Sequence, residues 1–294
     1  MFNKFSNKIT LVDVAALTLV IAAITFFIFR MGSVLAYEWN WGAIPQYFFY
    51  VDPDTGIWVP NILARGFFTT IKLSLWATVL AFVLGTITGI MGARGDGFQR
   101  FVSRAYVEVV RNIPSLVLLI IFYYFVSSQF LDVLGLDLWL RKQPEGMQRA
   151  LSIVLADAGR LNAFLSAVAA LGLYEGAYIC EIVRGGILGL PKGQWEGAYS
   201  IGLSSTQTFR LIILPQAIRK VAFPLAGQFI SAIKDSAIVS VISIQELTFQ
   251  GMEVMAATFL TFEVWVTVTL LYFTLTFSLS MGINYLEKKS FPRA

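Results

Sequence analysis

The chain has 294 residues, of which 57% are hydrophobic and only 14% are charged, and it carries a net charge of +4. A water-soluble domain would carry about 25% charged residues, so the composition indicates lipid as the solvent. With no histidine and one cysteine, Cys180, the sequence excludes Ser-His-Asp and Cys-His catalysis, an internal disulfide, and ordinary zinc sites.

Six apolar segments are each long enough to cross a bilayer, which takes about 20 residues. In chain order they are Val12–Phe29, Phe67–Met91, Pro114–Phe130, Leu161–Val183, Val221–Ile244 and Phe259–Tyr285. The first segment follows Lys4 and Lys8 like a signal peptide, but we interpret it as a retained membrane helix. The sequence therefore predicts an all-α membrane protein with six spans.

Two of the hydrophilic stretches that connect the spans near the outer face are long enough to hold further structure. Tyr37–Trp58 is rich in aromatic residues, which indicates an interfacial helix or an aromatic belt; the alternative is a docking surface for an extracytoplasmic partner. The stretch Leu131–Arg160 could hold another interfacial helix. Inside the second segment, Gly85 and Gly89 have the spacing that lets helices approach closely, although this spacing also arises by chance.

Lysine and arginine gather in the first, third, fifth and last hydrophilic stretches, whereas the opposite stretches offset their bases with acids. By the positive-inside rule, both termini are expected in the cytoplasm. Because the bases are spread between apolar runs, lipid is the expected partner and nucleic acid is not.

The stretch Arg184–Pro224 is longer than a connector requires and is patterned. Pro191 suits the first turn of a helix, and Ser204 with Gln207 has capping-box spacing, so a second helix is expected from there to Pro215. Four residues of the first helix are expected on one face: Trp195, Ala198, Tyr199 and Gly202. That face either folds back on the chain's own bundle or enters a groove on another protein.

The string Glu196-Gly197-Ala198-x-x-x-Gly202, followed nine residues later by Ile212-x-Leu214-Pro215, resembles the EAA loop of ABC importer permeases. Gly197 departs from the family, which usually has alanine there, and glycine loosens a helix by about 1 kcal/mol. The resemblance implies that the loop, at about residues 185–220, holds the coupling helix that docks into a cytoplasmic ATPase. It assigns coupling to Glu196, Gly197, Ala198 and Gly202, with Leu214 and Pro215 shaping the return of the loop.

The flanking strings look like the polar amino acid uptake branch of these permeases. They are Ala177-Tyr178-x-Cys180-Glu181-Ile182-Val183-Arg184-Gly185-Gly186, Pro191-Lys192-Gly193-Gln194-Trp195-Glu196, Lys234-Asp235-Ser236, Gln245-Glu246-Leu247, Arg111-Asn112-x-Pro114 and Thr70–Ser74. The resemblance covers about Gly66 to Tyr285. It implies a permease domain at 66–290 with a five-helix core, preceded at 1–65 by an extra membrane helix and the aromatic segment.

The same resemblance implies the working partners. They are two ATPase subunits, a second permease that is identical or homologous, an extracytoplasmic solute-binding protein and a polar amino acid, in the inner membrane of a bacterium. No P-loop string occurs, so no cofactor is expected in this chain, and ATP and Mg²⁺ are expected on the ATPase. The implied mechanism is alternating access without covalent chemistry.

Ionisable residues inside the spans need a role, because an unpaired charge in lipid costs several kcal/mol. Glu181 and Arg184, three residues apart, are expected to form a structural ion pair. The candidate substrate path consists of Glu175, Tyr178, Lys234, Asp235 and Ser236. Glu175 would attract an ammonium group and Lys234 a carboxylate; the alternative is a buried ion pair or a polar contact between subunits.

Two rival functions remain open at this stage. An ion-gradient-driven secondary transporter would explain the spans and the charges, but it leaves the patterned loop unexplained. A membrane-embedded enzyme would need a carboxylate or serine site, and no such constellation is visible in the sequence.

Overall fold

The structure is a computed structural model that describes residues 10–34 and 37–290. It divides into two compact units, Met1–Gly42 and Ala43–Ala294. The first unit contains one long helix, α1 (Leu11–Val34), which covers the first apolar segment. The Asp13 carboxylate accepts a hydrogen bond from the backbone N–H of Thr10 at 2.8 Å, which closes the first turn of α1. Lys4 and Lys8 lie outside the described residues.

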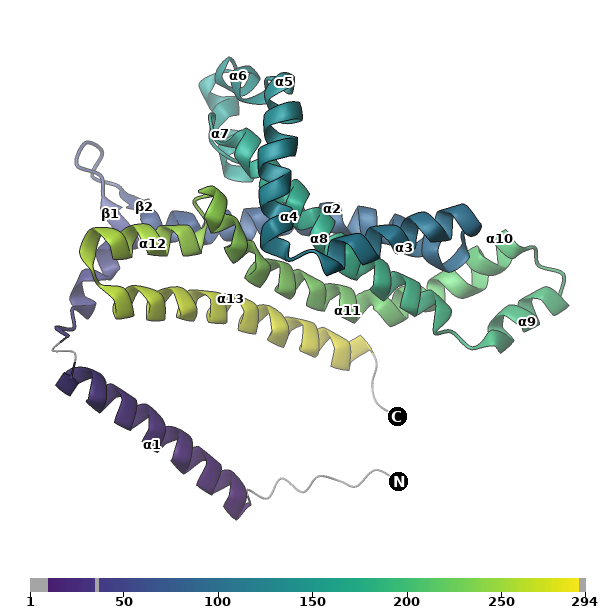
Figure 1. The fold of residues 1–294 in the computed structure, drawn as a ribbon, viewed down its shortest axis with the longest axis horizontal. Coiled ribbons are helices and arrows are strands. Elements are labelled where there is room, and N and C mark those ends of the chain that lie inside the picture. The colour runs from purple at the N-terminus through teal and green to yellow at the C-terminus, as the bar shows by residue number, and fades with distance from the viewer. Residues whose placement is uncertain (1–9, 35–36, 291–294) are drawn as a thin grey trace. The chain divides into compact units, whose positions relative to one another are not determined.

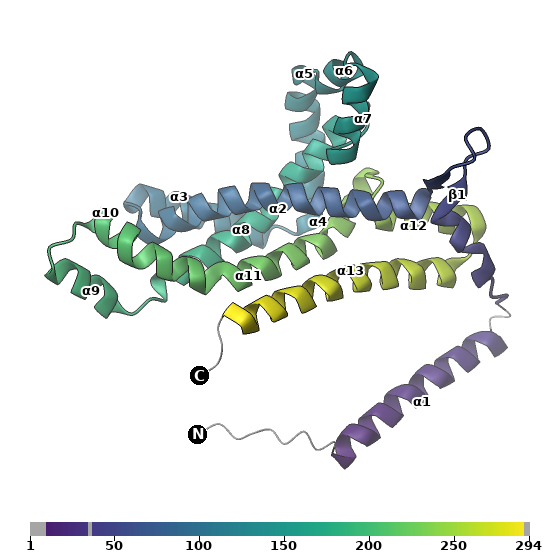
Figure 2. The same ribbon diagram turned by 180° about the vertical axis from the view of Figure 1, so that it is seen from behind.

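The second unit is a bundle of long apolar helices that run side by side (Figures 1 and 2). Among the described residues, four helices are long and apolar enough to cross a membrane: Ile62–Arg94, Leu161–Leu188, Ser205–Ile242 and Thr261–Lys289. A fifth crossing is added if two helices that meet at 106° count as one span. The prediction of an all-α membrane protein is confirmed, and the count of six spans stays a prediction.

The closest packing in the bundle is between α2 (Ile62–Arg94) and α8 (Leu161–Leu188). A Cβ placed on Gly85 would lie 2.6 Å from the backbone oxygen of Gly176, and one on Gly89 would lie 2.8 Å from that of Cys180. The two glycines therefore hold the backbones of α2 and α8 in contact, as their spacing permits. The side chains that meet these glycines, Ile179 and Val183, belong to a buried apolar cluster.

The third apolar segment is bent away from the helix before it. α3 (Gly97–Asn112) ends at Ile113, whose extended backbone is the conformation favoured before a proline. α4 (Ser115–Ile121) starts after Pro114 and continues through the π-helical η3 (Phe122–Leu131) into α5 (Asp132–Leu134). Two short helices follow, α6 (Leu136–Arg141) and α7 (Glu145–Val154), so the stretch Leu131–Arg160 does hold helix.

The expectation of an interfacial helix at Tyr37–Trp58 is wrong. Two 3₁₀ turns, η1 (Trp41–Ala43) and η2 (Pro45–Tyr47), precede an antiparallel hairpin of β1 (Phe49–Val51) and β2 (Trp58–Pro60). Its loop contains Gly56 at φ +66° and Asp52, whose carboxylate accepts a hydrogen bond from the Asp54 N–H at 2.9 Å. Such turn chemistry favours a hairpin over a helix.

The last two apolar segments differ from their expected bounds. The fifth is part of a longer helical run made of α10 (Ser205–Gln207), π-helical η4 (Thr208–Ile213), α11 (Leu214–Asp235) and 3₁₀ η5 (Ser236–Ile242). A separate helix, α12 (Leu247–Thr258), lies before α13 (Thr261–Ser290) and was not expected. The carboxylate of Glu246 starts α12 by accepting hydrogen bonds from the N–H groups of Thr248 and Phe249 at 2.9 and 2.8 Å.

Candidate functional site

The loop with the patterned sequence forms one short helix and a defined turn. α9 (Lys192–Ser200) begins after Pro191 and ends in a Schellman motif at Gly202. In this motif the N–H of Leu203 donates to the oxygen of Ala198 at 3.2 Å, and the N–H of Gly202 donates to the oxygen of Tyr199 at 2.9 Å. Gly202, at φ +83°, therefore terminates α9, which corrects the expectation that it lies on the helical face.

The next helix begins at Ser204, as its capping box predicts: the Gln207 N–H donates to the Ser204 hydroxyl at 3.4 Å, and the Ser204 N–H donates to the Gln207 amide at 2.9 Å. The expectation that this helix ends at Pro215 is wrong, because it continues into α11. A proline lacks an N–H and clashes with the carbonyl four residues earlier. The π-helical turn η4 directly before Leu214 and Pro215 widens the backbone there and accommodates the ring.

One face of α9 packs against the chain's own bundle. Ala198 is buried, and Trp195 packs against the apolar cluster that contains Phe209 and Ile213. Two polar contacts tie the ends of the loop to α11. The Gln216 amide donates to Gln194 at 2.9 Å, and the Lys220 ammonium donates to the oxygen of Gly189 at 2.7 Å.

Among the described residues, none covers the other face of α9 in this way. Glu196 and Gly197 are exposed, and the apolar side chains of Tyr199 and Ile201 are 47% and 75% exposed. A Cβ placed on Gly197 would meet no atom within 4 Å. The two expectations for this helix thus apply to opposite faces, since one face folds back and the other is free to meet a second protein.

Arg94 connects the end of α2 to this loop, and it was not among the expected coupling residues. Its guanidinium lies 4.3 Å from the centre of the Phe209 ring and donates to the hydroxyl of Ser205 at 3.3 Å. Its only sequence signal is a basic residue in the last turn of a span. Arg94 therefore joins α2, through α10 and η4, to the residues that follow the coupling string.

The candidate path residues on α8 lie in the packed interior. Glu175 is 1% exposed; one carboxylate oxygen accepts a hydrogen bond from the Gln228 amide of α11, and the other, Oε1, is buried with no hydrogen-bond partner among the described residues. One turn further on, the Tyr178 hydroxyl lies 3.1 Å from that of Tyr174, and the guanidinium of Arg111 lies 5.0 Å from the centre of the Tyr178 ring.

The candidate path residues on α11 and η5 separate by exposure. Lys234 is exposed, Asp235 is half-buried beside a small void that Tyr174 also lines, and Ser236 is buried with its hydroxyl donating to the oxygen of Ile233 at 2.7 Å. Glu175 and Gln228 thus form a polar contact between α8 and α11, and Gln228 was not expected to take part.

Near the coupling-loop end of α8, Glu181 and Arg184 form a two-pronged ion pair. The guanidinium of Arg184 donates through Nε and a terminal nitrogen to the two carboxylate oxygens of Glu181, at 2.9 and 2.7 Å. Both charges are thereby satisfied within one helix, which supports a structural role.

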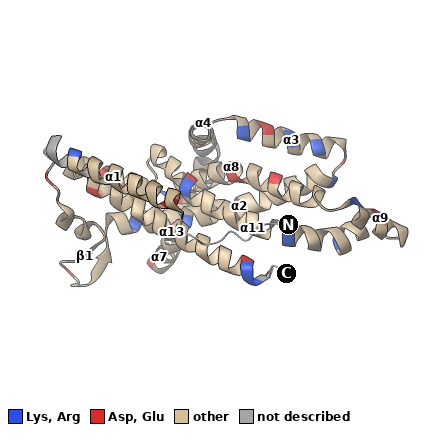
Figure 3. Cartoon of the chain, turned by 90° about the horizontal axis from the view of Figure 1, so that it is seen from below, with Lys and Arg blue, Asp and Glu red and all other residues tan. Residues whose placement is uncertain are grey.

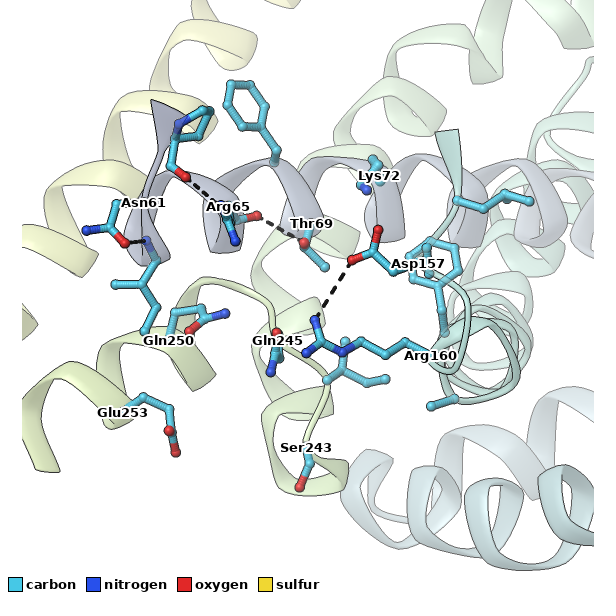
Figure 4. A pocket seen from close by; sticks show the side chains of 18 residues that line it. Asn61, Arg65, Thr69, Lys72, Asp157, Arg160, Ser243, Gln245, Gln250 and Glu253 are labelled. Carbon is cyan, nitrogen blue, oxygen red and sulfur yellow. Dashed lines mark hydrogen bonds and ion pairs between the residues drawn. The ribbon is translucent and has the colours of Figure 1, made fainter. Parts of the chain in front are cut away.

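At the end of the bundle opposite α9, a cavity of about 690 Å³ opens between α2, the α7–α8 link and the start of α12 (Figures 1 and 4). We call it the α2–α12 cavity. Five charged residues line it: Arg65, Lys72, Asp157, Arg160 and Glu253. The cavity itself requires three distant segments to meet, and no local sequence signal shows that.

The two ends of the bundle also differ in charge. Figure 3 shows basic residues along α3 and at the end of α13, with fewer acidic residues among them. Lys192 and Lys220 add further positive charge to the end that carries α9, while the mixed charges of the α2–α12 cavity lie at the other end.

Helices of membrane-spanning length, a helical loop at one end of the bundle and a charged cavity at the other agree with a membrane transport permease. The chain belongs to the family described as "Binding-protein-dependent transport system inner membrane component", which it matches over residues 83–291.

Named relatives and a solved structure agree with this assignment. The chain is 34% identical to the probable glutamine ABC transporter permease protein GlnM of Bacillus subtilis, over 76% of this chain and 91% of the relative. It is 27% identical to the glutamate/aspartate import permease protein GltJ of Escherichia coli, over 87% of this chain and 96% of the relative. A solved amino acid ABC transporter with histidines superposes with a TM-score of 0.62 at 29% identity, over 78% of this chain and 94% of that chain.

Proposed function

We propose that the chain is the transmembrane subunit of an ATP-driven ABC importer that takes up polar amino acids by alternating access. The observation that carries the proposal is α9, which presents Glu196, Gly197 and exposed apolar groups outside the bundle in a member of this permease family. The named relatives are a probable permease for glutamine and a permease for glutamate/aspartate, which supports a polar amino acid as the substrate.

The ATPase is a separate subunit that binds ATP and Mg²⁺ and receives α9 in a groove. Closure of two such subunits moves α9, and the movement enters the bundle through the contacts of α9 with α11 and through Arg94 with α2. A second permease, identical or homologous, completes the path, and a solute-binding protein delivers the amino acid. The basic end of the bundle lies in the cytoplasm of a bacterium with both termini, as the positive-inside rule requires.

The central polar residues are proposed to lie on the path that opens between α8 and α11. A buried carboxylate oxygen without a partner costs free energy, and an ammonium group of the substrate would satisfy Oε1 of Glu175. Glu175→Gln should therefore change the relative uptake of neutral, acidic and basic amino acids. Unchanged affinity and rate for all three classes would remove Glu175 from the path.

The importer proposal is tested by purifying the tagged chain from native membranes and assaying ATP hydrolysis with loaded binding protein. We expect a stoichiometric ATPase partner that is lost when Gly193–Ser204 is deleted. Transport should be abolished by vanadate and insensitive to uncouplers. The opposite pattern would favour an ion-gradient-driven secondary transporter, and turnover of a substrate by the purified chain alone would favour an enzyme.

A further inference from the structure

The α2–α12 cavity contains none of the residues assigned to coupling or to the central path. Its volume of about 690 Å³ is within the usual range for small-molecule sites, about 300–1,000 Å³. Three cations, Arg65, Lys72 and Arg160, face two carboxylates, Asp157 and Glu253, so the charged groups sum to +1. A mixture of both signs in one cavity suits a ligand that also carries both signs.

The α2 wall offers unused cationic donors. Arg65 donates through Nε to the oxygen of Pro60 at 2.8 Å, and Lys72 donates to the oxygen of Ser152 at 2.8 Å. Both acceptors are neutral, and neither cation forms an ion pair with a described residue. Because a guanidinium has five N–H donors and an ammonium has three, each retains donors for an anion. Figure 4 shows both residues on the same helix beside the cavity.

The opposite wall offers an acid and an amide. Glu253 and Gln250 lie three residues apart on α12, and Figure 4 shows them at the end of the cavity away from Asp157 and Arg160. The side-chain amide of Gln250 lines the cavity and forms no hydrogen bond with a described residue. Its two N–H donors and its oxygen are therefore available to a ligand in the cavity. At the other end, Asp157 and Arg160 already pair with each other at 4.0 Å.

We propose that the α2–α12 cavity binds the free amino acid at the outer face, with its α-carboxylate at Arg65 and Lys72 and its α-ammonium at Glu253. The Gln250 amide is then available to a polar side chain. The excess positive charge disfavours basic amino acids at this site. The proposal rests on the proposed importer function, and it adds an entry site to it. A zwitterionic lipid headgroup shares this chemistry, so the experiment separates the two sources.

The test uses the complete transporter with its ATPase, in nanodiscs of phosphatidylglycerol and without binding protein. Binding is measured for three labelled probes: glutamine, its des-amino analogue glutaramate, and its decarboxylated analogue 4-aminobutanamide. We expect Arg65→Gln or Lys72→Met to lower the affinity for glutamine and for glutaramate about tenfold, because both probes carry the carboxylate. The affinity for 4-aminobutanamide should not change. Glu253→Gln should lower the affinity for glutamine and for 4-aminobutanamide, which carry the ammonium group, and leave the affinity for glutaramate unchanged. Arg149→Gln is the matched control, because Arg149 is an exposed cation that pairs with Glu145 on α7 outside the cavity.

Four results would overturn the cavity proposal, and a fifth would refute the importer function. An equal loss of affinity for all three probes would mean that these residues have a structural role. Affinities that none of the variants changes would place the bound amino acid elsewhere. Loss of glutamine binding when phosphatidylethanolamine is included in the nanodisc bilayer would identify the cavity as a lipid-headgroup site. A wild-type transporter that imports glutamine but fails to bind it here would refute the cavity alone. Absence of ATP-dependent uptake of any amino acid would refute the importer function itself.

Discussion

Replacement of Gly202 by alanine tests the coupling loop directly, since the change acts on the turn and not on the bundle. A Cβ at this position would meet no atom within 4 Å, so the penalty comes from the backbone alone. At φ +83° an L-residue with a side chain costs roughly 1–2 kcal/mol. That cost raises the population of molecules with the Schellman turn open about five- to thirtyfold.

The measurement is hydrogen exchange at the amide of Leu203, which donates to Ala198 and is protected only while the turn is closed. Gly202→Ala should speed its exchange by that factor and lower the amount of amino acid imported per ATP. Gly197→Ala is the control on the same loop. Its Cβ also meets nothing within 4 Å, but the residue is helical, so alanine stabilises α9 by about 1 kcal/mol and slows exchange. Unchanged exchange at Leu203 in Gly202→Ala would refute this account of the turn.

Three further predictions concern the bundle. Gly85→Ala should destabilise the protein by about 1–3 kcal/mol in thermal unfolding, because the added Cβ falls 2.6 Å from Ile179. Gly227→Ala is the control, since open space surrounds its Cβ, and equal melting temperatures of the two variants would contradict the close α2–α8 contact. Glu246→Ala should cost about 4.5 kcal/mol, because its carboxylate accepts three short hydrogen bonds at about 1.5 kcal/mol each. Tyr272→Phe, which removes one of the three, should cost about a third as much. An Ala variant as stable as the wild type would refute the anchoring role. Arg94→Met should reduce the amount of amino acid imported per ATP. The stability should change little, because the cation–π contact with Phe209 is worth only about 0.5–1 kcal/mol. Import per ATP equal to that of an Arg104→Met control would exclude Arg94 from coupling.

Features fixed by neighbouring residues could be predicted from the sequence. Pro191 and the Ser204 capping box mark helix starts through local hydrogen bonding, and the structure has both. Pro215 misled the prediction because the π-helical turn that accommodates it has no simple sequence signal. The aromatic residues of Tyr37–Trp58 indicate affinity for an interface but not a backbone conformation; Pro53 and Gly56 carried the hairpin signal.

Features made by distant segments could not be predicted. Glu175 was singled out as a charge within a span, but its partner Gln228 is 53 residues away in the chain. The α2–α12 cavity joins Arg65 to Glu253 through tertiary packing alone. α12 was missed because the acid that starts it, Glu246, stands in the sequence as an interruption between two apolar runs, and only its buried contacts with Thr248 and Tyr272 explain it.

One continuous helical run links the three regions described above. Ser205–Ile242 contains 38 residues and is therefore about 57 Å long at 1.5 Å per residue. Phe209, at one end, packs in the cluster that holds α9; Gln228, near its middle, binds Glu175; and Ser243, directly after its other end, lines the α2–α12 cavity. Packing of α11 against α2, α8 and α13 favours movement of the run as a unit, although Pro224 removes one backbone hydrogen bond within α11. In the proposed importer, a displacement of α9 by the ATPase therefore reaches Glu175 and the α2–α12 cavity along one helical run, without a relay of separate side-chain movements.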